Sequence, residues 1–210
     1  YNALLKTACH TKGEMSCVSC HRLHQDRKDT RPRKEWANDQ LKAEALGDQA
    51  CTQCHEAAAY ASPKHTHHAA GSGGSSCYNC HMPYTSYGLL TAIRSHAIYS
   101  PSAAAYKATG RPDACNLCHL DKPLAWTADH LQKWYDIPGP DLDPEDREVA
   151  LAAALALRGD AAQRALVAYA LGWQPALEAS NRDWIPPYLA NLLKDPYSAV
   201  RYIAARSLKR

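Results

Sequence analysis

A five-residue pattern, Cys-x-x-Cys-His, occurs four times in this chain of 210 residues. The four copies occupy residues 17–21, 51–55, 77–81 and 115–119. Two cysteines separated by two residues and followed at once by a histidine form the attachment signature of c-type haem. The thiols add to the porphyrin vinyl groups as thioethers, and the adjacent histidine is placed to bind the iron from one face. The pattern therefore predicts four covalently bound haem c groups.

These motifs define the first set of candidate residues. The predicted thioether-forming residues are Cys17, Cys20, Cys51, Cys54, Cys77, Cys80, Cys115 and Cys118. The predicted proximal iron ligands are His21, His55, His81 and His119. Zinc is the alternative, because four pairs of cysteines can build two tetrahedral thiolate sites. Such sites do not need a histidine directly after each second cysteine, so the sequence favours haem.

The second axial ligand of each iron separates electron transfer from catalysis. The chain has only two methionines, Met15 and Met82, and Met82 follows His81 too closely to reach the opposite face of the same haem. Bis-histidine ligation is therefore the expectation. Without a methionine thioether, which favours the ferrous state, we expect low reduction potentials.

Seven histidines lie outside the motifs, and four of them supply one distal ligand per haem: His24, His65, His68 and His96. His24 lies three residues after His21, so it points to a neighbouring haem rather than its own. His65 and His68 share one face if their turn is helical. For each, the alternative is a surface residue or a hydrogen bond to a propionate.

The other three histidines and the ninth cysteine have less defined roles. His67 is expected to be a bystander beside His65 and His68. His130 falls in an expected amphipathic helix, 124–135, as a packing or surface residue, with ligation as the alternative. Cys9, followed by His10, has Lys6 where a motif needs cysteine. It is a buried thiol, a link to a partner, or the single thioether of a fifth haem, and His10 is a further candidate to cap a haem here or in an adjacent subunit.

Composition divides the chain near residue 120. Residues 1–120 have few long aliphatic runs and no phenylalanine, so four macrocycles are expected to supply their core. Residues 121–210 are rich in Ala and Leu and show helix start and stop signals. We expect helices over about 38–46, 124–135, 143–158, 160–171, 186–194 and 196–208. The predicted fold is mainly α: a tetrahaem cytochrome c domain over 1–120 and a small helical domain over 121–210.

The compartment follows from the same chemistry. Thioether attachment takes place on the oxidising side of a bacterial-type inner membrane, and the cysteine content suits an exported protein. No apolar stretch of about 18 residues occurs, so no transmembrane segment is expected. We expect a periplasmic or extracellular protein whose leader has been removed. A net charge of +3 gives no indication of nucleic-acid binding.

Residues from about 9 to 210 resemble exported multihaem c-type cytochromes with a C-terminal HEAT- or TPR-like helical region. The matching stretches are residues 19–24, 65–71, 80–83, 94–96 and 110–116, while residues 195–204 resemble the second half of a HEAT repeat. The resemblance implies the same four distal ligands, His24, His65, His68 and His96. Longer relatives carry further haems upstream, so the chain is either a fragment or a short version.

Two classes of function are compatible with these residues. The first is electron transfer through four bis-histidine haems between redox partner proteins, with a homo-oligomer or filament as a special case. The second is a multihaem reductase with one open iron. Multihaem nitrite reductases commonly mark such an iron with Lys in place of the motif histidine, and no Cys-x-x-Cys-Lys occurs here. We therefore expect a protein that is not an enzyme.

Overall fold

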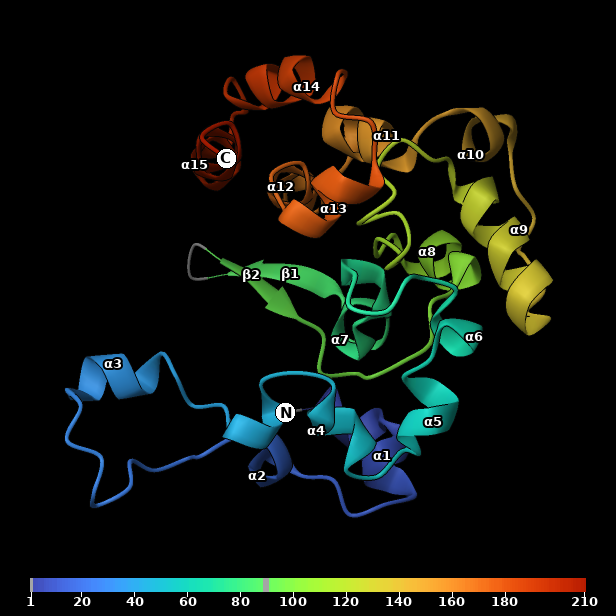
Figure 1. Cartoon of the computed structure of the whole chain (residues 1–210). Coiled ribbons are helices and arrows are strands. Elements are labelled where there is room, and N and C mark those ends of the chain that lie inside the picture. Colours follow the sequence, from blue (N-terminus) through green and yellow to red (C-terminus); the bar gives the residue numbers. More distant parts are fainter. Residues whose placement is uncertain (1, 89–90) are drawn as a thin grey trace. The chain divides into compact units, whose positions relative to one another are not determined.

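The computed structural model describes residues 2–88 and 91–210, and it is mainly helical, as the sequence predicts. The chain forms two compact units (Figure 1). The first comprises residues 1–82 and 96–99, and the second comprises residues 83–95 and 100–210. The change of composition near residue 120 therefore lies within the second unit, which holds the fourth motif together with the Ala- and Leu-rich helices.

The first unit is a succession of very short helices joined by loops. They are η1 (Leu4–Lys6), α1 (Ala8–Thr11), α2 (Cys17–Cys20), α3 (Arg33–Ala37), η2 (Ala43–Ala45), α4 (Gln49–Thr52), α5 (Ala57–Tyr60), α6 (Pro63–Thr66), η3 (Gly73–Ser75) and α7 (Cys77–His81). Among its described residues, the buried hydrophobic side chains are only Leu4, Ala45 and Ala50. So small an apolar core cannot by itself hold about 80 residues in one arrangement.

The helix expected over 38–46 is wrong. Helix α3 ends at Ala37, and residues 40–42 run in an extended form beside the first motif. The amide of Arg22 donates to the carbonyl of Gln40 (2.7 Å), and the amide of Lys42 donates to the carbonyl of Cys20 (2.9 Å). These backbone hydrogen bonds outweigh the weak helix preference of residues 38–46. They join residues 40–42 to the C-terminal end of the first motif.

The second unit contains a β-hairpin and a series of helices. The antiparallel strands are β1 (Tyr84–Gly88) and β2 (Thr91–Arg94). The helices are α8 (Ala103–Thr109), α9 (Leu124–Tyr135), α10 (Pro144–Glu148), α11 (Leu151–Arg158), α12 (Ala161–Ala170), α13 (Gln174–Ala179), α14 (Ile185–Leu192) and α15 (Ser198–Ser207). All of these helices except α10 contribute residues to one hydrophobic core, which also includes Leu117 and Leu120 near the fourth motif.

Local helix signals were informative in this unit. Helix α9 has the bounds that its periodicity predicts, and Asp160 and Gln163 form the expected capping box of α12. The single helix expected over 143–158 is wrong, because the chain breaks at Val149 between α10 and α11. Helix α13 and the β-hairpin were not anticipated.

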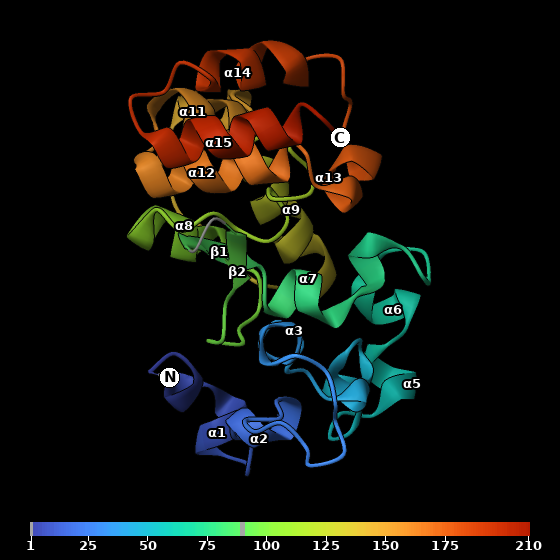
Figure 2. The same ribbon diagram turned by 90° about the vertical axis from the view of Figure 1, so that its left-hand side faces the viewer.

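Helices α11, α12, α14 and α15 lie side by side in two layers (Figure 2). Small residues allow the close approach of α15 to the end of α12. Ser207 donates from its hydroxyl to the carbonyl of Ala168 (2.7 Å), and a Cβ at Gly172 would lie 2.5 Å from the Cβ of Ser207. The pair α11 and α12 and the pair α14 and α15 therefore pack through a shared core.

An ion pair links these layers. Arg164 of α12 donates to both carboxylate oxygens of Asp195, at 2.6 and 3.1 Å, and Asp195 accepts a further bond from the amide of Tyr197 (2.8 Å). The Asp195 side chain is only 5% exposed. The Arg164 guanidinium, followed by the Tyr197 amide, lowers the pKa of Asp195.

We predict that Asp195→Ala lowers the free energy of unfolding of the helical unit by about 2–4 kcal/mol, because it leaves Arg164 without its carboxylate partner. A lowered folded-state pKa means that the contribution of Asp195 is present above its unfolded pKa of about 4 and is lost as the pH falls through its folded pKa. Guanidinium titrations followed by far-ultraviolet circular dichroism at neutral and acidic pH measure both effects. Lys194→Ala, at an exposed neighbouring residue, is the control and should leave the midpoint unchanged.

Candidate haem sites

The motif cysteines are presented at the starts of short helices and turns. Ser16 forms a capping box with Ser19 at the start of α2. At the fourth motif, Asp113 accepts a hydrogen bond from the amide of Cys115 (2.8 Å). Capping of this kind satisfies the first amides of a turn. None of the eight motif cysteines forms a disulfide bond within the described part of the chain, and all of them are partly or fully exposed.

The surroundings of three of these thiols, those of Cys20, Cys51 and Cys77, favour the neutral form. Burial raises the pKa of Cys20 and Cys51, and burial together with the nearby Cys51 and Asp48 raises the pKa of Cys77 to about 12. Among residues 2–88 and 91–210, no three His, Cys, Asp or Glu side chains converge as a metal-binding group.

His65 and His81 face each other in the first unit. Their ring centroids are 6.3 Å apart and their planes differ by 5°. The Nδ1 atom of His81 is hydrogen-bonded to the carbonyl of Tyr99 (3.0 Å), and the amide of Tyr99 donates back to the carbonyl of His81 (3.1 Å). A carbonyl partner requires a proton on Nδ1, which leaves the lone pair of Nε2 for a metal.

His21 and His96 form a second pair of the same kind. Their centroids are 6.2 Å apart and their planes differ by 25°. His96 follows directly after the β-hairpin. At the base of the hairpin, the amide of Ser95 donates to the carbonyl of Pro83 (2.8 Å). The next residue, His96, belongs to the first unit. A residue 75 positions beyond His21 is thereby placed opposite it.

These separations fit an iron atom between the two rings. An imidazole nitrogen binds a metal at about 2 Å and lies about 1 Å in front of its ring centroid, so two rings on one iron have centroids about 6 Å apart. Burial, followed by the facing histidine, lowers the pKa of His21. Burial also lowers the pKa of His81, despite the opposing effect of the Tyr99 carbonyl. Both imidazoles are thus held neutral, which is the form that binds iron.

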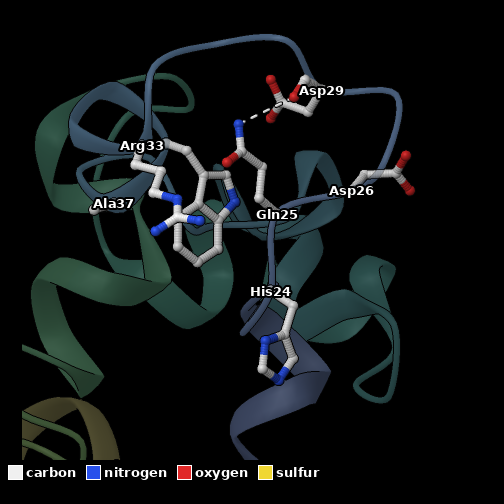
Figure 3. A pocket seen from close by; sticks show the side chains of 7 residues that line it. His24, Gln25, Asp26, Asp29, Arg33 and Ala37 are labelled. Carbon is white, nitrogen blue, oxygen red and sulfur yellow. Dashed lines mark hydrogen bonds between the residues drawn. The ribbon is translucent and has the colours of Figure 1, made fainter.

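His24 lies on the wall of a cavity of about 570 Å³, which Gln25, Asp26, Asp29, Arg33, Trp36 and Ala37 also line. Its imidazole projects away from the loop that carries the acidic residues (Figure 3). Gln25 stabilises this loop by donating to the carbonyl of Asp29 (3.0 Å). The role of His24 as a distal ligand stays a prediction.

His68 is not on the same helix as His65. Helix α6 ends at Thr66, and His67 adopts the left-handed conformation with φ of 53°. The turn from His65 to His68 is therefore not helical, and the condition under which the two imidazoles would share a face is not met. The Nδ1 of His68 is bonded to the carbonyl of Thr66 (2.6 Å), and its ring lies so close to Gly74 that a Cβ there would be 2.1 Å from it. The glycine-rich loop thus gives room to an imidazole, and His68 as a ligand stays a prediction.

The other two proximal histidines contact aromatic side chains. Tyr60 lies between two imidazoles, with its ring centroid 5.5 Å from His55 and 5.3 Å from His65. In the second unit, the ring centroids of His119 and Trp126 are 4.6 Å apart, and those of Trp126 and His130 are 4.1 Å apart. The Nδ1 of His130 is bonded to the carbonyl of Trp126 (2.7 Å), in agreement with a packing role on α9.

Cys9 lies in the short helix α1, which Thr7 caps by accepting from the amide of His10 (3.2 Å). The Nδ1 of His10 is bonded to the carbonyl of Met15 (2.8 Å). The thiol of Cys9 is half-buried. All three interpretations of this cysteine remain open.

Three residues of the sites were not anticipated from the sequence: Tyr60, Tyr99 and Asp48. Tyr60 and Tyr99 act through ring and backbone contacts, which leave no sequence signal. Asp48 lies three residues before Cys51 and accepts a hydrogen bond from the amide of Cys77 (2.9 Å). An acidic residue just before a motif is a capping signal that could have pointed to it.

Comparison with known families bears on this arrangement. Residues 36–120 match the model of a family described as cytochrome c7 and related cytochrome c. This stretch holds three of the four motifs and supports a multihaem c-type cytochrome, with covalent haem, iron and electron transfer. No curated protein and no solved structure matches the chain. In the part of the chain that the structure describes, no helix is both long enough and apolar enough to cross a membrane.

We predict that His65→Ala converts one haem of the protein from low-spin to high-spin, because it removes the imidazole facing His81. The matched control is His67→Asn, since asparagine tolerates the left-handed backbone of that position. Electron paramagnetic resonance of the oxidised protein separates the two spin states. A fully low-spin His65→Ala protein would show that His65 is not an iron ligand.

Proposed function

We propose that this chain is an exported tetrahaem electron-transfer protein in which every iron has two histidine ligands. The observation that carries the proposal is the pair of facing imidazoles, His21 with His96 and His65 with His81, at separations of 6.2 and 6.3 Å. One member of each pair, His21 or His81, is the histidine of a haem-attachment motif. Haem, when bound, supplies an iron that carries one electron as it changes between its ferric and ferrous states.

In this proposal the protein positions the histidine ligands and keeps substrates away from the iron. The two bonds between His81 and Tyr99 fix the orientation of one imidazole and keep the proton of its neutral form on Nδ1, so that its coordination does not require a change of tautomer. An iron with an imidazole on each face offers no position for a substrate. Holding both ligands in place before and after electron transfer keeps the rearrangement small.

The remaining assignments follow the sequence. We propose His24 and His68 as the two further distal ligands. The partners are redox proteins, a donor and an acceptor, and the compartment is periplasmic or extracellular because thioether attachment occurs there. Assembly into an oligomer or filament is an extension of the same function.

The decisive experiment is the visible spectrum of the dithionite-reduced protein before and after addition of carbon monoxide, with the haems counted by mass. We predict four covalent haems and a low-spin spectrum that carbon monoxide does not change, because every sixth position is filled. A shift in part of the spectrum would indicate an open iron and favour the multihaem reductase. A protein matured with a haem-attachment system that carries no haem would contradict the proposal.

A further inference from the structure

A single residue, Asp48, is bonded to the first cysteines of two different motifs. Its backbone carbonyl accepts a hydrogen bond from the amide of Cys51 (2.9 Å), the first cysteine of the second motif. Its carboxylate Oδ1 accepts from the amide of Cys77 (2.9 Å), the first cysteine of the third motif, and from the hydroxyl of Ser76 (3.3 Å). Asp48 therefore caps the start of α7 from the start of α4.

A second bond between the same segments supports this arrangement. The hydroxyl of Tyr78 donates to the carbonyl of Ala45 (2.8 Å), so the segments 45–48 and 76–78 are joined at two points. The thiols of Cys51 and Cys77 are close enough to be hydrogen-bonded to each other. Because 26 residues separate these cysteines in the chain, their contact depends on tertiary bonds.

We propose that Asp48 is a positioning residue that holds the second and third haems as a closely coupled pair. The inference rests on the proposed function, because it places haem on both motifs. Haems attached at these two neighbouring sulfur atoms would have their cysteine-bearing edges close together. The Asp48 carboxylate lies beside both attachment points, and its negative charge favours the ferric state of this pair.

The fourth motif provides a matched comparison. Asp113 accepts from the amide of Cys115 (2.8 Å), as Asp48 does from Cys77, but its other oxygen accepts from the amide of Ser102 (2.7 Å). Asp113 thus holds a motif cysteine against ordinary backbone rather than against a second motif. A variant at Asp113 controls for the loss of a cap at a haem motif.

The test compares Asp48→Ala, Asp48→Asn and Asp113→Asn as haem-loaded proteins. Circular dichroism in the Soret band reports the coupling of neighbouring porphyrins, and a potentiometric titration reports their potentials. We expect Asp48→Ala to carry four haems with a weakened Soret couplet, because the acceptor of the Cys77 amide is lost. Asp48→Asn keeps an oxygen acceptor, so it should retain the couplet while the potentials of two haems rise. Asp113→Asn should leave the couplet and those two potentials unchanged.

Failure of the proposed role of Asp48 can be distinguished from failure of the proposed function. A wild-type protein without covalent haem contradicts the function itself. A four-haem Asp48→Ala protein with the wild-type couplet overturns only the role of Asp48. If Asp48→Ala does not mature, Asp48→Asn decides: a native couplet with raised potentials supports the inference, and unchanged potentials or a lost couplet contradict it.

Discussion

Two imidazoles that bind one iron have ring centroids about 6 Å apart, and two histidine pairs of the first unit have this separation. One imidazole of each pair belongs to a Cys-x-x-Cys-His motif, and the other comes from elsewhere in the chain. His65 reaches His81 from α6, and His96 reaches His21 from the end of the hairpin. A hydrogen bond at the other ring nitrogen sets the orientation of an imidazole, as the carbonyl of Tyr99 does for His81.

The two units obtain their stability in different ways. In the second unit, apolar residues of α9, α11, α12, α14 and α15 share one core that also takes in Leu117 and Leu120. Ser180 adds two bonds, accepting from the amide of Leu120 (2.8 Å) and donating to the carbonyl of Cys118 (2.7 Å). The fourth motif is therefore packed against the hydrophobic core of the second unit. The first unit has three short motif segments and very few buried side chains, so its cohesion depends on what the motifs bind.

Sequence reasoning succeeded where the cause was local. The motifs, the bounds of α9 and the capping box of Asp160 depend on residues within a few positions of each other. It failed where distant backbone decided the outcome. The segment 40–42 is extended because it pairs with the first motif, and nothing in its own residues indicates that. Likewise, His96 could be named as a ligand but not assigned to His21, because that pairing depends on an unanticipated hairpin.

The position of His96 beyond the hairpin also has a consequence for the order in which the two histidine pairs can form. His65 precedes His81, so both members of that pair are present once residue 81 has been synthesised. His96 follows His21 by 75 residues, and residues 83–95 of the second unit lie between them in the chain. Because a chain is made from its N-terminus, the pair of His21 and His96 becomes possible only after the pair of His65 and His81.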